Sequence, residues 1–529
     1  MVLSACRWRG QVLFHGYAMN SIDDATHQRV GAITVVGGGS AGWMAAALLA
    51  TYLGKGATIR LVESEEIGIV GVGEASVPHL RQFNGQWLGI DEADFVKRTQ
   101  ATAKLGIQFN DWGCIGDSYI HGFGAIGRSL GPLPFHQFWL KQRLAGKAAP
   151  IGAYSAQSVM APQGRFAPGD RNAQPDSPLA DIAYAYHFDA TLYARFLREL
   201  AEQRGVQRIE GKIVKVNQRA GDGFIESLQL ENGQIVEGEL FIDCSGLRGL
   251  LIEETLKTGY TDWSDWLPCD SALAVPSERV DPITPYTRAT ARAAGWQWRI
   301  PLQHRTGNGY VYSSAHISDD EAAATLLANL DGKALGTPRQ LRFTTGMRNK
   351  AWHKNVVALG LASGFLEPLE STSIYLAQSG VTRLLSLFPR RDFNPLLIER
   401  FNRETAFEYE RIRDFLILHY HATERDDTPF WNACRTMAIP DTLREAMDLF
   451  RRDGRYLRHG DDFFALPNWV QVMLGQGIVP RNYHPMVDEM PDDRLQEHVD
   501  GVRSMLARAV PSMPLHQEWI DRYWKAPAA

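Results

Sequence analysis

The chain has 529 residues, a formal net charge of −5, 22% charged residues and 45% apolar residues. This length allows one large domain with an attached subdomain, or two to three ordinary domains, and the composition excludes disorder, fibres and disulfide scaffolds. Lysine and arginine are scattered along the sequence, so no basic stripe indicates a nucleic-acid partner and no polybasic segment indicates a membrane. A small-molecule partner is therefore expected.

The five cysteines lie far apart without a CxxC pair, which predicts neither a metal site nor a disulfide framework and favours a reducing cytoplasm. No apolar run reaches the roughly 18 residues of a membrane-spanning helix. The first residues include Arg7, Arg9 and His15, unlike a secretory signal. We expect residues 1–29 to be a leader, either disordered or the product of a mis-set translation start.

The first expected elements form a βαβ unit. A buried strand at residues 32–36 leads into the glycine turn 37–42 and then into a helical run at 43–50. A second strand, 58–62, ends at Glu63 and completes the unit.

The later chain contains further strands and then helices. Residues 150–181 are rich in Pro, Gly, Gln, Ser and Asp, which predicts a long surface excursion rather than a core element. Apolar patterns predict a hairpin meander within 213–230 and strands that run into glycine turns at 239–246 and 356–360. From residue 394 the apolar spacing becomes helical.

The glycine turn has the setting of a dinucleotide-binding site. Gly37, Gly39 and Gly42 form GxGxxG between a strand and a helix. Such glycines permit the tight turn and the close approach of a pyrophosphate, while the helix start offers free N–H groups and the positive end of its dipole. Glu63 is expected to accept a ribose hydroxyl. The motif does not separate FAD from NAD, but the two later strand-to-turn returns are typical of FAD-binding monooxygenase-like folds and favour FAD.

A second motif, WxWxIP, occurs within residues 295–301, which read GWQWRIP. Here the chain resembles the flavin-dependent tryptophan halogenase family. Alone, the motif could also be a core strand that ends at a proline. Further blocks match the family in the same order, and the resemblance runs from about residue 30 to 480. These blocks are residues 37–43, 71–78, 104–107, 186–190, 241–250 and 365–372.

The resemblance implies an α/β fold with an FAD-binding Rossmann-like, flavin monooxygenase-like domain and an attached, mainly helical C-terminal subdomain. Residues 30–393 would form the FAD-binding and halide domain with inserted strands and loops, and residues 394–529 the substrate-side subdomain. The segment 66–78 would be a strap beside the flavin. The expected cofactor-binding residues are Gly37, Gly39, Ser40, Ala41, Gly42, Glu63, Gly73, Glu74, Ala75, Leu359 and Gly360.

Lys104 and Glu370 match the catalytic pair of the family. The lysine would hydrogen-bond hypohalous acid or form a haloamine from it; otherwise Lys104 is an ordinary surface lysine. The glutamate would polarise the halogenating species or take the proton of the arene; otherwise Glu370 is a carboxylate at a helix start. Thr372 and Ser373 match the halide site, although the family often has Gly in place of Ser373.

Other residues would shield the flavin or contact the substrate. Trp296 and Trp298 would block direct attack of the oxygenated flavin on the organic substrate. His121 and Phe123 match residues that sandwich an indole, an arrangement that adds about 0.5–1.5 kcal/mol beyond area burial. A packed core histidine is the alternative for His121. The expected substrate contacts are His121, Phe123, Pro78 and Trp469, and Trp469 could equally be a core residue.

The region 461–480 departs from the tryptophan-specific members, because the acidic and aromatic stretch that grips the amino-acid backbone is shortened. A more open site for indole-like or larger aromatic compounds is therefore expected.

The resemblance implies an enzyme that uses FADH2, oxygen and chloride or bromide to halogenate an electron-rich aromatic compound. It also implies a separate flavin reductase, since nothing in the chain resembles a nicotinamide domain. A homodimer is the default assembly, and no metal is expected. Two alternatives stay open: an FAD-dependent aromatic hydroxylase, which needs neither Lys104 nor halide, and a non-catalytic FAD-binding or sensor protein.

Overall fold

A computed structural model describes residues 29–65, 73–169, 179–180, 182–458, 460 and 462–527. Residues 1–28 of the expected leader and residues 66–72 of the expected strap lie outside the described residues.

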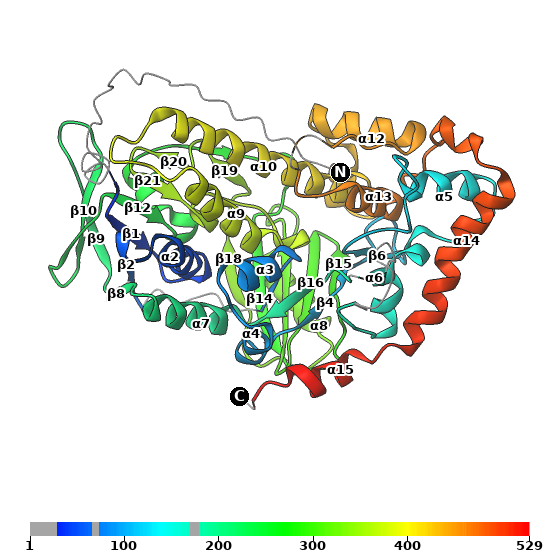
Figure 1. Cartoon of the computed structure of the whole chain (residues 1–529), viewed down its shortest axis with the longest axis horizontal. Helices are drawn as coiled ribbons and strands as arrows, with labels where there is room; N and C mark the ends of the chain where they lie inside the picture. Colours follow the sequence, from blue (N-terminus) through cyan, green and yellow to red (C-terminus); the bar gives the residue numbers. More distant parts are fainter. Residues whose placement is uncertain are drawn as a thin grey trace, which may run out of the picture.

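One end of the molecule is a six-stranded sheet, on the left in Figure 1. The predicted βαβ unit is confirmed, because β1 pairs in parallel with β2 and the helix α2 (Ser40–Leu53) connects them. β12 lies on the other side of β1, also in parallel. In sheet order the strands are β20 (Trp352–His353), β21 (Val356–Ala358), β12 (Leu240–Asp243), β1 (Ala32–Val36), β2 (Thr58–Glu63) and β8 (Gln207–Glu210).

Helix α2 lies in the core of this end. Its residues from Gly42 to Ala50 are all buried, and they include four alanines, which combine high helix propensity with close packing. It packs against α7 (Ala190–Gln203) and α9 (Ser373–Ser386). This packing fixes the start of α2 against the sheet.

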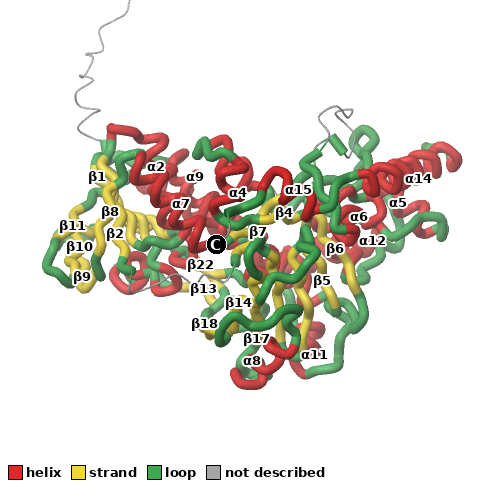
Figure 2. The backbone as a smooth tube through the Cα atoms, turned by 90° about the horizontal axis from the view of Figure 1, so that it is seen from below, coloured by secondary structure: helices red, strands yellow, loops and turns green. Residues whose placement is uncertain are grey.

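A seven-stranded sheet forms the centre of the molecule (Figures 1 and 2). Strand β16 carries the WxWxIP motif, and all of its residues are buried. In sheet order the strands are β18 (Arg339–Arg342), β14 (Ser271–Ser277), β17 (Thr306–Tyr312), β16 (Gly295–Pro301), β15 (Thr287–Arg292), β5 (Gly106–Asn110) and β6 (Ser118–Gly122).

Three small sheets complete the strands. The expected meander is confirmed as an antiparallel sheet of β9, β10 and β11. Another small sheet has β7 in its middle and joins the end of the strap to the strand that carries Lys104. The strands are β9 (Ile213–Gln218), β10 (Ile225–Leu230), β11 (Ile235–Glu237); β3 (Glu74–Ala75), β7 (Ala185–Phe188), β4 (Thr102–Lys104); and β13 (Tyr260–Asp262), β19 (Gly346–Arg348), β22 (Gly364–Phe365).

The chain after residue 394 is helical in its described part, as its spacing predicts; the domain boundary itself stays a prediction. These helices are α10 (Pro395–His421), α11 (Pro429–Thr436), α12 (Asp441–Asp453), α13 (Leu466–Gly475), α14 (Asp492–Ala509) and α15 (His516–Trp519). Earlier helices are α3 (His79–Gln82), α4 (Glu92–Arg98), α5 (Phe135–Leu144), α6 (Ala156–Met160) and α8 (Asp319–Ala328). Within the described chain, no helix has the length and apolarity needed to cross a membrane.

The end of the chain returns to the strand that carries Lys104. In Figure 2, α15 lies beside β4 and apart from α12 and α5. The backbone N–H of Ala103 donates to Nε2 of His516 at 3.0 Å, and the N–H of Ala526 donates to Oε1 of Gln303 at 2.8 Å. The C-terminal segment thus supports the first half of the chain as well as the helices around it.

The expectation of a surface excursion at 150–181 is wrong for its first part. Residues 151–163 form short helices, and Tyr154, Met160 and Phe166 are fully buried. Ser155 caps one of these helices and Pro162 lies in the first turn of the next, so residues that suggested a loop mark helix starts instead, and the apolar side chains between them fill the core. Residues 170–178 and 181 lie outside the described part.

Candidate active site

The glycine turn contains two glycines that the fold needs and one that leaves open space. Gly37 has φ +109°, and a Cβ there would lie 2.3 Å from the carbonyl oxygen of Cys244. A Cβ on Gly42 would lie 1.9 Å from the carbonyl oxygen of Gly37. By contrast, a Cβ on Gly39 meets no atom within 4 Å. The open side of Gly39 is where a ligand can approach the turn.

Distant segments meet at the start of α2. The turn after β12 contacts Gly37 through the carbonyl oxygen of Cys244. Gly360 comes so close to α2 that a Cβ on it would lie 2.8 Å from the Cβ of Ala41. Gly39 is the N-cap of α2, and no side chain caps this helix. The first N–H groups, including those of Ser40 and Ala41, are therefore available to an anion. Leu359 lies directly before Gly360, and its N–H donates to the carbonyl of Asp243.

Glu63 lies across the glycine turn, at the end of β2. A Cβ on Gly38, which lies between the motif glycines, would fall 1.4 Å from Oε2 of Glu63, which can turn away, and 2.7 Å from its Cβ, which cannot, so this position also favours glycine. Nε of Arg208 donates to Oε1 of Glu63 at 2.5 Å. Sequence analysis did not identify Gly38 or Arg208, because neither belongs to the spacing of the motif.

The described end of the strap leads to Lys104. Gly73 has φ +84°, and Glu74 and Ala75 form β3, which pairs with β7. The carbonyl oxygen of Ser76 accepts a hydrogen bond from Nζ of Lys104 at 3.0 Å. Pro78, one of the expected substrate contacts, follows as the N-cap of α3.

Lys104 is fully buried, with 0% of its surface exposed, which overturns the alternative of an ordinary surface lysine. Its Nζ donates to Oγ of Ser371 at 2.8 Å and lies 5.3 Å from the centre of the Phe123 ring. Burial lowers the pKa of Lys104 from 10.5 to about 7, although the carboxylates of Glu370 and Glu74 oppose this. Near neutral pH this amine therefore both donates hydrogen bonds and exchanges its proton.

Glu370 lies between two histidines. Nδ1 of His121 is 3.0 Å from both of its carboxylate oxygens, and Nε2 of His419 is 2.9 Å from Oε1. Burial favours the neutral acid, but His121 and His419 outweigh it and hold the pKa of Glu370 at about 2. Glu370 lies two residues before Thr372, the N-cap of α9, but no side chain caps that helix, and the carboxylate contacts the two histidines instead.

The loop after Glu370 presents an unpartnered hydroxyl. Ser371 has φ +59°, a left-handed conformation that turns the chain into α9. Thr372 is buried, and its Oγ1 has no hydrogen-bond partner within the described chain. Ser373 begins α9, whose N-cap makes no side-chain hydrogen bond. A buried donor at an uncapped helix start suits a small anion.

The two tryptophans of WxWxIP are packed below this loop. Trp296 and Trp298 are both buried in β16, with ring centres 6.1 Å apart. Nε1 of Trp296 and the hydroxyl of Tyr420 both donate to Oε2 of Glu367, at 2.9 Å and 2.5 Å. Burial raises the pKa of Glu367 to about 7 against these two hydrogen bonds. Glu367 thereby connects the motif to the loop that carries Glu370.

Aromatic rings surround the other side of Glu370. The ring of Phe415 lies 5.7 Å from His121 and stacks on Phe464 at 3.9 Å. Trp469 meets Phe415 edge-on at 4.9 Å and stacks on Tyr456 at 4.6 Å. His121 and Trp469 therefore lie in one aromatic cluster with Phe415 and Phe464, which sequence analysis missed; the role of Trp469, as substrate contact or core residue, stays a prediction.

Comparisons with known proteins agree with this geometry. Residues 32–492 match the family model described as tryptophan halogenase. The chain is 33% identical to tryptophan 7-halogenase RebH of Lentzea aerocolonigenes, over 93% of this chain and 98% of that protein. The chain belongs to the tryptophan halogenase family.

Solved structures of flavin-dependent halogenases have the same fold. Xcc4156 from Xanthomonas campestris is 51% identical, with a TM-score of 0.91 over 95% of this chain and 100% of that chain. BrvH from Brevundimonas sp. BAL3 is 45% identical, with a TM-score of 0.90 over 94% and 100%. The expected α/β fold with a helical C-terminal region is confirmed, and the chain is a flavin-dependent halogenase, so the hydroxylase and sensor alternatives are set aside.

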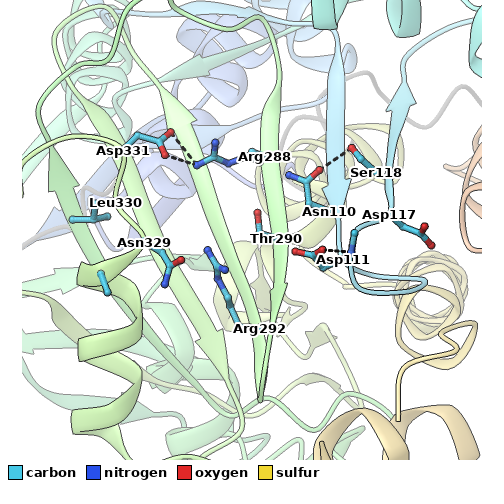
Figure 3. A pocket seen from close by; sticks show the side chains of 12 residues that line it. Asn110, Asp111, Asp117, Ser118, Arg288, Thr290, Arg292, Asn329, Leu330 and Asp331 are labelled. Carbon is cyan, nitrogen blue, oxygen red and sulfur yellow. Dashed lines mark hydrogen bonds and ion pairs between the residues drawn. The ribbon is translucent and has the colours of Figure 1, made fainter. Parts of the chain in front are cut away.

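A surface pocket lies on the seven-stranded sheet (Figure 3). Figure 3 shows Arg288 turned toward Asp331, and their side chains are 2.9 Å apart. On the other side, Asp111 accepts from the backbone N–H of Gly116 at 2.7 Å. Arg288 thus pairs with Asp331, whereas Arg292 donates to the amide oxygen of Gln297, and the lining includes none of the expected site residues.

Sequence analysis missed three direct neighbours of Lys104 and Glu370, the expected catalytic pair. Ser76 and Ser371 accept hydrogen bonds from Lys104, and His419 touches Glu370. One signal was present for His419: it lies four residues after Phe415 on a buried helix, where an apolar residue is the ordinary choice.

Proposed function

We propose that this flavin-dependent halogenase uses chloride or bromide to halogenate an electron-rich, indole-like aromatic compound, with hypohalous acid held at Lys104. The observation that carries the proposal is the burial of Lys104 beside Glu370. Burying an ammonium group is costly unless hydrogen bonds or opposite charges stabilise it, so a fully buried lysine is a candidate for a functional residue. A hydrogen bond to Ser371 holds Lys104 against the loop that carries Glu370.

FAD fits the glycine turn. The open side of Gly39 and the uncapped start of α2 would hold the pyrophosphate, and Glu63 would accept a ribose hydroxyl. When bound as FADH2, the cofactor supplies with oxygen the oxidising equivalent for the halide. A separate flavin reductase would provide FADH2. The four described cysteines are free thiols, which is compatible with the expected cytoplasmic location.

Thr372 and Ser373 would hold the halide. The unpartnered hydroxyl of Thr372 can donate to an anion, and the N–H groups at the start of α9 add the positive end of a helix dipole. Ser373 contributes its backbone N–H in this arrangement, so the absence of glycine does not remove the donor.

Lys104 and Glu370 would divide the chemistry. Nζ of Lys104 would orient the hypohalous acid, and the carboxylate of Glu370 would take the proton that the arene loses. Burial of both groups keeps water from quenching the oxidant, and a fixed distance between Lys104 and one ring carbon would select the site of substitution.

The substrate would lie in the aromatic cluster. RebH carries the name of a tryptophan 7-halogenase, but this chain has a shortened segment where tryptophan-specific members grip the amino-acid backbone. The rings of Phe415, Phe464 and Trp469 form a packed cluster beside His121. An indole-like ring without an amino-acid backbone suits this cluster.

The test is mass spectrometry of indole incubated with the purified protein, FAD, a flavin reductase, NADH and bromide. We expect a monobrominated indole that requires bromide and disappears in Lys104→Ala. A hydroxylated product formed without bromide would contradict the proposal. Parallel reactions with free tryptophan and with larger indoles would define the substrate class.

A further inference from the structure

His419, near the end of α10, has contacts that constrain where its protons lie. It is fully buried, and its ring packs 4.9 Å from Phe109 and 5.1 Å from Phe415. Nδ1 lies 2.8 Å from the carbonyl oxygen of Phe415, and Nε2 lies 2.9 Å from Oε1 of Glu370. Both ring nitrogens therefore face oxygen atoms.

A carbonyl oxygen can only accept, so Nδ1 of His419 must carry a proton. In a neutral imidazole, Nε2 would then present a lone pair to the carboxylate. Two acceptors 2.9 Å apart in a buried site repel each other, and the low local dielectric makes this repulsion strong. A proton on Nε2 removes the conflict, because the 2.9 Å contact then joins opposite charges even though the ring is not turned for an aligned hydrogen bond.

We propose that His419 and Glu370 hold one proton between them and that His419 is the proton store of the halogenation step. The inference rests on the proposed function, in which Glu370 takes the proton of the arene. His419 acts through Glu370 and is a positioning residue rather than one that touches the substrate.

The shared proton balances the reaction. When the arene attacks hypohalous acid, the carbon–halogen bond forms, the oxygen–halogen bond breaks, and the electron pair leaves on oxygen as hydroxide. The His419–Glu370 pair gives its proton to this hydroxide, which becomes water. The carboxylate then removes the proton from the substituted ring carbon and shares it again with His419. Hypohalous acid and arene become haloarene and water, and the protein ends with the proton count it began with.

The groups around the pair are compatible with one stored proton. Glu370 lies on the loop before α9, His121 and Tyr119 face it from β6, and Lys104 faces it from β4. Burial and the charge of Glu370 hold the pKa of Tyr119 well above its usual range, so its hydroxyl stays neutral. Glu74 on β3 also faces Lys104, and Nδ1 of His121 lies 3.0 Å from Oε1 of Glu370. His419 is thus the neighbour of Glu370 whose second nitrogen is already committed to a carbonyl.

A direct test is nitrogen-15 magnetic resonance of histidine-labelled wild-type protein, with His419→Gln to assign the signal. At neutral pH we expect Nε2 of His419 to bear a proton, and we expect Glu370→Gln to convert the ring to the neutral form protonated only at Nδ1. A bare Nε2 in the wild type would overturn the proposal. This measurement needs neither flavin nor substrate, so its result stands even when indole is the wrong substrate.

A kinetic test uses His419→Gln, whose amide can still donate to Glu370 but cannot store a proton. We expect kcat for bromination to fall at least about 10²-fold, a loss typical of a removed proton-transfer group, with KM for the arene changed less than about threefold. His421→Gln, two residues on in the same helix, is the matched control, and we expect its kcat to stay at the wild-type value.

Two outcomes of the kinetic test would overturn the inference. One is a His419→Gln enzyme with wild-type kcat. The other is a fall in kcat that is accompanied by a clear fall in Tm, which indicates that His419 has a packing role alone. Absence of any brominated product in the wild type instead counts against the proposed function, while the protonation measured by magnetic resonance remains decisive for His419.

Discussion

At the glycine turn the important residues are neighbours in sequence and act through their backbone, whereas at Lys104 they come from separate segments and act through buried side chains. Gly37 and Gly42 are required because a Cβ would collide with the main chain. Lys104 lies on β4, Glu370 lies just before α9, and His419 lies on α10, so these residues meet only in the folded protein. Changes at the turn should therefore affect cofactor binding and folding, and changes at Lys104 should affect the reaction.

The largest expected effect is that of Glu370→Gln. The amide keeps the size of the side chain but cannot take a proton, so we expect kcat for bromination to fall about 10²–10⁴-fold. Flavin affinity, followed by fluorescence titration, should stay unchanged because the turn is built separately. A kcat within tenfold of the wild type would remove Glu370 from the proton-transfer role.

The glycine turn and the surroundings of Lys104 differ in how much of each could be predicted from the sequence. The GxGxxG spacing, the strand before it and Glu63 follow from local rules, and the structure has all three in place. Lys104 and Glu370 were found through family resemblance, because nothing local distinguishes them from other charged residues. His419, Ser76 and Ser371 were missed, since their contacts depend on tertiary packing between residues that lie from 28 to 267 positions apart in the sequence. The wrong surface assignment of 150–181 has the same origin: composition described the turns, and burial depended on partners elsewhere.

A pair of glycine variants would sharpen the comparison within the turn itself. Gly42→Ala places a methyl group 1.9 Å from the carbonyl oxygen of Gly37, and we expect the free energy of unfolding to fall by about 1–3 kcal/mol, as for other overpacked sites. Gly39→Ala meets no atom within 4 Å, so stability should change little while FAD affinity decreases. Denaturation curves and flavin titrations separate the two effects. Equal loss of stability in both variants would contradict the assignment of Gly39 to the ligand.

The substitution Thr372→Val tests the proposed halide site. The substitution keeps the shape of the side chain and removes the hydroxyl, and a hydrogen bond to a charged group contributes about 1.5–3 kcal/mol, so KM for bromide should rise at least about tenfold. Thr382→Val, on the same helix α9, is the control. An unchanged KM for bromide would place the halide elsewhere.

A smaller effect is expected in the pH dependence of stability. Because burial lowers the pKa of Lys104 to about 7 from 10.5, the unfolded chain binds more protons between these two values. The free energy of unfolding of the wild type, relative to Lys104→Met, should therefore rise with pH from about 7, by at most about 1.4 kcal/mol per pH unit. Urea denaturation at several pH values between 8 and 10 measures this difference. A flat difference would mean that Lys104 keeps its ordinary pKa in the folded protein.

The most direct test of the central claim compares the fate of the oxidant in the wild type and in Lys104→Met. Both proteins are supplied with FADH2, oxygen, bromide, indole and a soluble trap for hypobromous acid. The amounts of brominated indole and of trapped hypobromous acid are then measured. We predict that Lys104→Met still consumes FADH2 and still produces trapped hypobromous acid, while brominated indole falls by at least about 10²–10³-fold, as expected for loss of a stabilising donor. Brominated indole at the wild-type level in Lys104→Met would contradict the account.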